Sequence, residues 1–139
     1  MDDQTPRYTG GCLCGAVRYE AKGETPLMGH CYCADCRKAS GSGFIPFIGF
    51  ARGALHFTGE VRQHRSPSAR GGIAVRNFCA QCNSLVYGGE REISDSFTIY
   101  AGSLDDPSLF RPAIGIFTRG RPDWACVPPA LTCFEGPPG

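Results

Sequence analysis

The arrangement of cysteines constrains this chain more than any other feature of its sequence. Nine of its 139 residues are cysteines, and seven of these fall into three clusters. The clusters are a C-x-C pair (Cys12 and Cys14), a C-x-C-x-x-C triplet (Cys31, Cys33 and Cys36) and a C-x-x-C pair (Cys79 and Cys82). Such short spacings let neighbouring sulfurs converge on one metal ion, so the pattern predicts metal binding.

The alternatives to metal binding fit the sequence less well. The N-terminal segment is polar and lacks the apolar core of a secretory signal, which favours a cytoplasmic, reducing compartment. An odd number of cysteines also cannot close a disulfide framework. A thioredoxin-like redox role would need a βαβ context around a C-x-x-C pair, and none is apparent. Thiolate ligands favour zinc, and neither standard ferredoxin run for an iron–sulfur cluster is present.

Seven ligands divide naturally into four and three. The two cysteine pairs, Cys12/Cys14 and Cys79/Cys82, together complete a closed four-thiolate site, which is the usual form of a structural zinc. The triplet of Cys31, Cys33 and Cys36 holds a second zinc with one position open for water or substrate. We therefore expect two zinc ions per chain, one structural and one of catalytic type. A fourth protein ligand would close the second site; the candidates are Cys126, Cys133, His30, His56 and His64.

Composition indicates a mainly β fold with little helix. Nineteen glycines and eleven prolines are spread evenly along the chain, and no amphipathic pattern of ten or more residues supports a long helix. Apolar or alternating segments predict strands near 13–21, 44–50, 54–58, 73–78, 85–87, 97–101 and 113–117, with one helical turn at 33–40. We expect small antiparallel sheets organised around zinc within a single domain, 1–139. The Pro/Gly-rich segment 128–139 predicts a weakly ordered tail.

Charge and hydropathy exclude other partners. The formal net charge is +1, and seven thiolates with two zinc ions would bring it to about −2, so nucleic acid is not an expected partner. No apolar run approaches the roughly 18 residues that cross a bilayer, so no membrane partner is expected either.

The motifs resemble the family of the glutathione-dependent formaldehyde-activating enzyme and centromere protein V. The matching stretches are 10–19, 31–41, 78–82 and 102–107, followed by Trp124, so the resemblance spans about residues 10–124. It implies a β-tent fold around zinc. It also implies that the two pairs hold a structural zinc, while the triplet holds a catalytic zinc that accepts the thiol of glutathione. The implied activity is that of a carbon–sulfur lyase similar to S-(hydroxymethyl)glutathione synthase.

The chain departs from the family pattern at three positions. Tyr32 replaces the histidine of the family's C-H-C, Asn83 replaces the glycine that usually follows the C-x-x-C pair, and Gly115 replaces the histidine of a late P-x-x-H-I motif. Asparagine tolerates a left-handed turn, so the turn at Asn83 is expected to survive.

Two functional hypotheses follow. In the first, the chain is an enzyme that activates a small thiol such as glutathione on zinc and adds it to an aldehyde such as formaldehyde. Arg37 and Lys38, beside Cys36, are candidates to offset the negative charge of the site. In the second, a closed second site makes the chain a non-catalytic zinc module that binds a protein or nucleic-acid partner. Phe44, Phe47 and Phe50 are expected in the core, with pocket lining as the alternative, and Trp124 is expected to pack.

Overall fold

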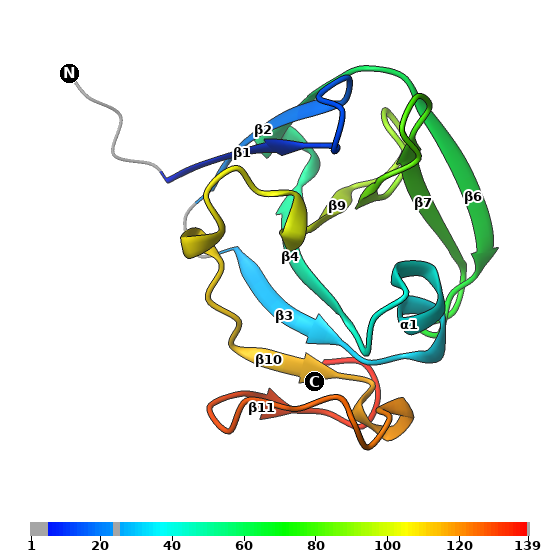
Figure 1. The fold of residues 1–139 in the computed structure, drawn as a ribbon, viewed down its shortest axis with the longest axis vertical. Coiled ribbons are helices and arrows are strands. Elements are labelled where there is room, and N and C mark those ends of the chain that lie inside the picture. Colours follow the sequence, from blue (N-terminus) through cyan, green and yellow to red (C-terminus); the bar gives the residue numbers. More distant parts are fainter. Residues whose placement is uncertain (1–5, 24–25, 139) are drawn as a thin grey trace.

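Two β-sheets form the architecture of the computed structural model, which describes residues 6–23 and 26–138 (Figure 1). The smaller sheet is antiparallel, in the order β1-β2-β5; its strands are β1 (Arg7–Gly11), β2 (Arg18–Lys22) and β5 (Leu55–Thr58). β2 is half-buried in the alternating sense, because Tyr19 and Ala21 face the core while Arg18 and Glu20 do not.

The larger sheet runs in the order β11-β10-β3-β4-β9-β8-β7-β6. Its strands in chain order are β3 (Leu27–Cys31), β4 (Ile45–Ala51), β6 (Val61–Pro67), β7 (Ile73–Cys79), β8 (Leu85–Gly88), β9 (Ser96–Tyr100), β10 (Ile114–Ile116) and β11 (Thr132–Cys133). All neighbours pair antiparallel except β10, which pairs parallel with both β3 and β11. The chain is therefore mainly β, as the sequence predicts, although these parallel pairs were not expected.

Helical structure is short. α1 (Ala34–Ser40) spans seven residues, and four 3-10 turns complete the helical content of the described residues: η1 (Arg52–Ala54), η2 (Ala101–Ser103), η3 (Pro107–Leu109) and η4 (Thr118–Gly120). Cys33 caps the start of α1 by accepting a hydrogen bond from the Cys36 N–H, and Gly41 ends it in the left-handed conformation at φ 69°. The predicted helical turn at 33–40 is confirmed. Within the described ranges, no helix is long and apolar enough to cross a membrane.

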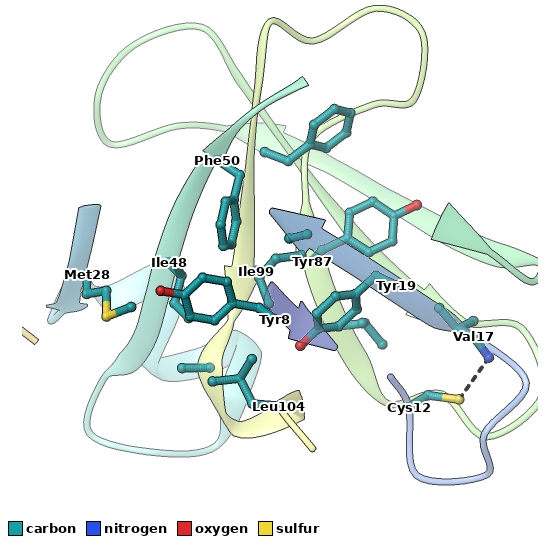
Figure 2. Packing of buried hydrophobic residues seen from close by; sticks show 14 of the residues in the cluster. Tyr8, Cys12, Val17, Tyr19, Met28, Ile48, Phe50, Tyr87, Ile99 and Leu104 are labelled. Atoms are coloured by element: carbon teal, nitrogen blue, oxygen red, sulfur yellow. Dashed lines mark hydrogen bonds between the residues drawn. The ribbon is translucent and has the colours of Figure 1, made fainter. Parts of the chain in front are cut away.

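The main core lies between the two sheets (Figure 2). Tyr8 and Tyr19 from the small sheet lie on one side, and Ile48 and Ile99 from the large sheet lie on the other. Tyr8 packs edge-on against Phe50, with ring centroids 5.3 Å apart. The core thus fixes how the small sheet sits on the large one.

The strand predictions succeed where apolar alternation is strong. The expected strands at 44–50, 54–58, 97–101 and 113–117 correspond to β4, β5, β9 and β10, and the expected hairpin is β7–β8. The prediction that a strand begins near Leu13 is wrong. Residues 13–17 form a turn, and β2 begins at Arg18. The segment from Pro128 carries β11, which pairs with β10. Weak order in that segment stays a prediction.

Candidate functional site

Four cysteines meet where the two sheets approach each other. Cys12 and Cys14 lie in the turn after β1, Cys79 ends β7, and Cys82 lies in the turn before β8. Their sulfur atoms all lie within 4.8 Å of one another. The Sγ–Sγ distance is 3.6 Å for Cys12–Cys14 and 3.7 Å for Cys14–Cys79. Metal–sulfur bonds of about 2.3 Å in a tetrahedron place sulfurs about 3.8 Å apart, so this donor set fits one zinc ion.

Hydrogen bonds reach three of these sulfurs, those of Cys12, Cys79 and Cys82. Val17 N–H donates to Cys12 Sγ at 3.2 Å (Figure 2), and Gln81 N–H donates to Cys79 Sγ at 3.3 Å. The Ser84 hydroxyl lies 3.2 Å from Cys82 Sγ, and hydrogen bonds from this hydroxyl and its backbone lower the pKa of Cys82 to about 5. Asn83, at φ 64°, takes the left-handed turn that the sequence predicts for it.

Three cysteines meet at the other end of the structure. Cys31 is the last residue of β3, Cys33 caps α1 and Cys36 lies in its first turn, with all three sulfurs within 4.8 Å of one another. Hydrogen bonds from the thiols of Cys31 and Cys36, with those from backbone N–H groups, lower the pKa of the Cys33 thiol far below its ordinary value. In the described part of the chain, no fourth His, Cys, Asp or Glu joins this group. Both cysteine groups can therefore hold a metal ion, and the second offers three ligands.

A cavity of about 300 Å³ opens beside the three-cysteine group. All three of its cysteines line the cavity, whereas none of the other four does. Phe47 of β4 and Phe117, which follows β10, give this end an apolar wall that packs against the cysteines. Phe117 sits at φ 54°, a conformation that is costly for an aromatic residue, and its N–H donates to the Gly136 carbonyl at 2.9 Å.

Polar residues from other segments also line the cavity, beside apolar ones such as Ile73 and Val75. They include Arg76 on β7, Tyr100 on β9 and Arg70 in the β6–β7 turn. Arg76 is only 8% exposed. Burial raises the pKa of the Tyr100 phenol, and the nearby Arg76 guanidinium opposes that shift. No local motif marks these residues in the sequence, because the sheet gathers them from separate segments.

Comparison with known proteins identifies the family. The model of the glutathione-dependent formaldehyde-activating enzyme family matches residues 7–120, most of the chain. The chain belongs to this family. An uncharacterized lyase of Schizosaccharomyces pombe is 32% identical over 82 residues, which cover 59% of this chain and 57% of the relative. The chain thus matches little more than half the length of that relative.

A solved structure shares the fold. It is the crystal structure of a structural-genomics target protein from Rhodobacter sphaeroides, with 18% sequence identity and a TM-score of 0.56. The match covers 75% of this chain and 96% of that one. At this identity, the likeness concerns the fold alone. The family assignment rests on the family model and on the cysteine motifs within its matched range.

The candidate fourth ligands lie outside the three-cysteine group. Cys126 and Cys133 are exposed, and so are His56 and His64. His30 is buried, but it faces aromatic neighbours: its ring stacks on Phe44 with centroids 4.1 Å apart, and its Nδ1 lies 3.2 Å from the Tyr32 hydroxyl. His30 therefore points away from the cysteines, as expected for its place beside Cys31.

The other residues that the sequence suggested for the site or the core lie in different places. Arg37 and Lys38 lie in the last turn of α1 and do not line the cavity. Phe47 lines the cavity and is also buried, whereas Phe50 belongs to the main core. The expectation that Trp124 packs is wrong for most of its surface, because its side chain is 71% exposed.

Proposed function

We propose that this chain is a zinc-dependent carbon–sulfur lyase that forms or cleaves the adduct of a small thiol, such as glutathione, with formaldehyde or a related aldehyde. The observation that carries the proposal is that a three-ligand cysteine group opens into a cavity. Membership of the formaldehyde-activating family and the naming of a relative as a lyase support the reaction class. The family's usual thiol is the natural first substrate to test.

The donor chemistry supports two zinc ions with different tasks. Cys12, Cys14, Cys79 and Cys82 would hold a closed, structural ion, and Cys31, Cys33 and Cys36 would hold an open one. A zinc ion at the open site would accept the substrate sulfur as its fourth ligand and lower the thiol pKa, so that a thiolate forms at neutral pH.

The cavity walls provide the remaining functions. Phe47 and Phe117 cover the cysteine end with apolar surface and so limit the access of water to the reacting atoms. The phenol of Tyr100 is protonated at neutral pH, since the ordinary pKa of tyrosine is about 10 and burial raises it further. It can therefore donate a hydrogen bond to the carbonyl oxygen of the aldehyde. As the carbon–sulfur bond forms, the carbonyl π electrons move to that oxygen, which takes up a proton from the solvent and becomes the hydroxyl of the hemithioacetal; this proton balances the one that the thiol releases to the solvent when it ionises.

A non-catalytic zinc module is the competing hypothesis, and it requires a closed second site. Among the described residues, no fourth ligand meets the three cysteines, and the exposed Cys126 and Cys133 lie outside the group. The open group and its cavity therefore favour the enzyme.

Exchange kinetics test the proposal. Glutathione and formaldehyde also combine without catalysis, so the readout is the rate of exchange between free and adduct carbon, measured by NMR with ¹³C-formaldehyde. We expect the zinc-loaded protein to accelerate exchange, Cys36→Ser to abolish the acceleration, and the exposed control Cys126→Ser to retain it. Exchange at the uncatalysed rate with two zinc ions bound would overturn the assignment for these substrates.

A further inference from the structure

Arg76 stands out as a buried cation without a protein anion. Its side chain lies on the cavity wall formed by β7 and is 8% exposed. Nη1 donates to Ser66 Oγ at 3.3 Å, while the buried Nε has no hydrogen-bond partner. Nη2 likewise makes no hydrogen bond with a described residue. The edge formed by Nε and Nη2 therefore lacks a partner among the described residues, and its two parallel N–H groups match the oxygens of a carboxylate.

No carboxylate of the described residues pairs with this guanidinium. The ion pairs on this part of the sheet go elsewhere, since Arg65 on β6 pairs with Glu90. Burying a charge without a counter-charge costs several kcal/mol, and such a group persists where a ligand supplies the opposite charge. Arg76 thus has the environment of a residue whose partner arrives with the substrate.

The cysteine ligands are not that partner. Cys31 lies on β3 and Arg76 on β7, and the strands β4, β9 and β8 lie between them in the sheet. Tyr100 lies between the two ends, because its strand, β9, stands between β3 and β7 in the order of the sheet. A ligand that binds both ends must therefore carry its sulfur and its negative charge on different parts of one extended molecule.

We propose that Arg76 sets the specificity of the cavity for thiols that carry a carboxylate, which it binds through Nε and Nη2 while Ser66 fixes Nη1. This proposal rests on the proposed function, because it assumes that the thiol sulfur enters at the three-cysteine group. It predicts that small neutral thiols are poor ligands, because they cannot pair with this guanidinium. Arg76 acts on binding, not on the reacting bond.

Ligand binding to the cobalt-substituted protein tests this directly. The cobalt–thiolate absorption reports entry of a sulfur independently of turnover, and the ligands are glutathione, its diethyl ester and 2-mercaptoethanol. A bidentate, charge-assisted contact corresponds to roughly a 10- to 100-fold difference in Kd. We expect the wild-type protein to prefer glutathione over the diethyl ester by about this factor. Arg76→Gln should abolish the preference, and Arg76→Lys should retain part of it.

Two further variants keep the test decisive. Arg62→Gln removes an exposed arginine of β6 that does not line the cavity, and it should leave the preference unchanged. Ser66→Ala keeps the charge of Arg76 but removes the Nη1 contact, so it should reduce the preference by a few-fold even if Arg76→Gln does not fold.

The outcomes separate the two proposals. If the wild-type protein binds glutathione and its diethyl ester equally well, or if the preference survives in Arg76→Gln, the role of Arg76 is wrong while thiol binding stands. If no thiol changes the cobalt spectrum although both sites hold metal, the proposed function fails, and the role of Arg76 fails with it.

Discussion

At the scale of single residues, two departures from the family pattern lie against each other. Tyr32 is fully buried, and its hydroxyl donates to the Cys126 carbonyl at 3.1 Å. Its ring lies beside Gly115, where an added Cβ would be 3.4 Å from Tyr32 Cε2 and 3.5 Å from Cys133 Sγ. A larger ring at 32 and a missing side chain at 115 therefore fit together. Neither departure disturbs the cavity, because neither residue lines it.

This contact predicts energetic coupling between positions 32 and 115. Gly115→His should overpack the site and lower the free energy of unfolding by roughly 1–3 kcal/mol. Tyr32→His should also destabilise, because it leaves space and removes a hydrogen bond. In the double variant, the decrease in the free energy of unfolding should be smaller than the sum of the two single decreases, by at least ~0.5 kcal/mol. Denaturant unfolding in excess zinc measures this, and strict additivity would contradict the coupling.

A second prediction at this scale concerns Ser84. The hydrogen bonds from Ser84 hold the pKa of Cys82 at about 5, below the ordinary value of 9.0, so the thiolate persists until the pH falls through about 5. The stabilisation from this thiolate is complete above the unfolded-state pKa and is lost as the pH falls through the folded-state value. Ser84→Ala removes the hydroxyl and should raise the Cys82 pKa. Protons then compete with zinc at higher pH.

We expect the midpoint of zinc release in Ser84→Ala to shift to higher pH than in the wild-type protein. A chromophoric chelator can follow the release as the pH is lowered from 8 to 4. The exposed Ser42 offers the control, since Ser42→Ala should leave the midpoint in place. An unchanged midpoint in Ser84→Ala would mean that the hydroxyl does not tune this site.

At the scale of elements, the sequence predicts what is local and misses what depends on long-range pairing. The cysteine groups are readable because each spacing is a local property of a turn. β6 could not be predicted in this way, because nearly all residues of its sequence, VRQHRSP, are exposed and show no apolar alternation. β3 contains Gly29, where an added Cβ would lie 2.7 Å from Ile114. That close approach follows only from the parallel pairing with β10, some eighty-five residues later.

The same reasoning explains which half of the candidate site is predictable. Cys31, Cys33 and Cys36 lie within six residues, so one motif contains them all. The opposite wall combines Arg76 of β7, Tyr100 of β9 and Arg70 of the β6–β7 turn, and the pairing of the strands brings these separate segments together. Arg76 is also one of many arginines, and its distinguishing property is burial without a counter-charge, which only the tertiary structure reveals.

α1 allows a prediction at this scale, because it contains Cys36 and is capped by Cys33. Gly41 ends the helix at φ 69°, with its N–H donating to the Arg37 carbonyl. Gly41→Ala must place a Cβ in the left-handed region, which costs about 1 kcal/mol of stability. Gly53→Ala is the matched control, since Gly53 is exposed and an added Cβ there meets nothing within 4 Å. Thermal unfolding should separate the two variants, and equal midpoints would contradict the capping role.

At the scale of the whole molecule, the four-cysteine group connects the two sheets. Cys12 and Cys14 follow β1 of the small sheet, whereas Cys79 and Cys82 flank the β7–β8 turn of the large one. Cys14 and Cys79 are 65 residues apart in the chain. A metal ion that joins such distant segments closes a long loop and so restricts the unfolded chain strongly. The three-cysteine group joins only residues that are already neighbours, so its ion should add much less to stability.

This asymmetry gives the last prediction. Cys14→Ser should lose one zinc and unfold or become strongly destabilised, although Cys14 is exposed. Cys36→Ser should also lose one zinc but keep its tertiary structure, because its neighbours stay linked by the chain. Cys126→Ser, outside both groups, should keep two zinc ions and the wild-type stability. Native mass spectrometry counts the ions, and near-UV circular dichroism with thermal unfolding follows the fold. If Cys14→Ser is as stable as Cys36→Ser, the four-cysteine group does not hold the sheets together, and the division into a structural and an open site is wrong.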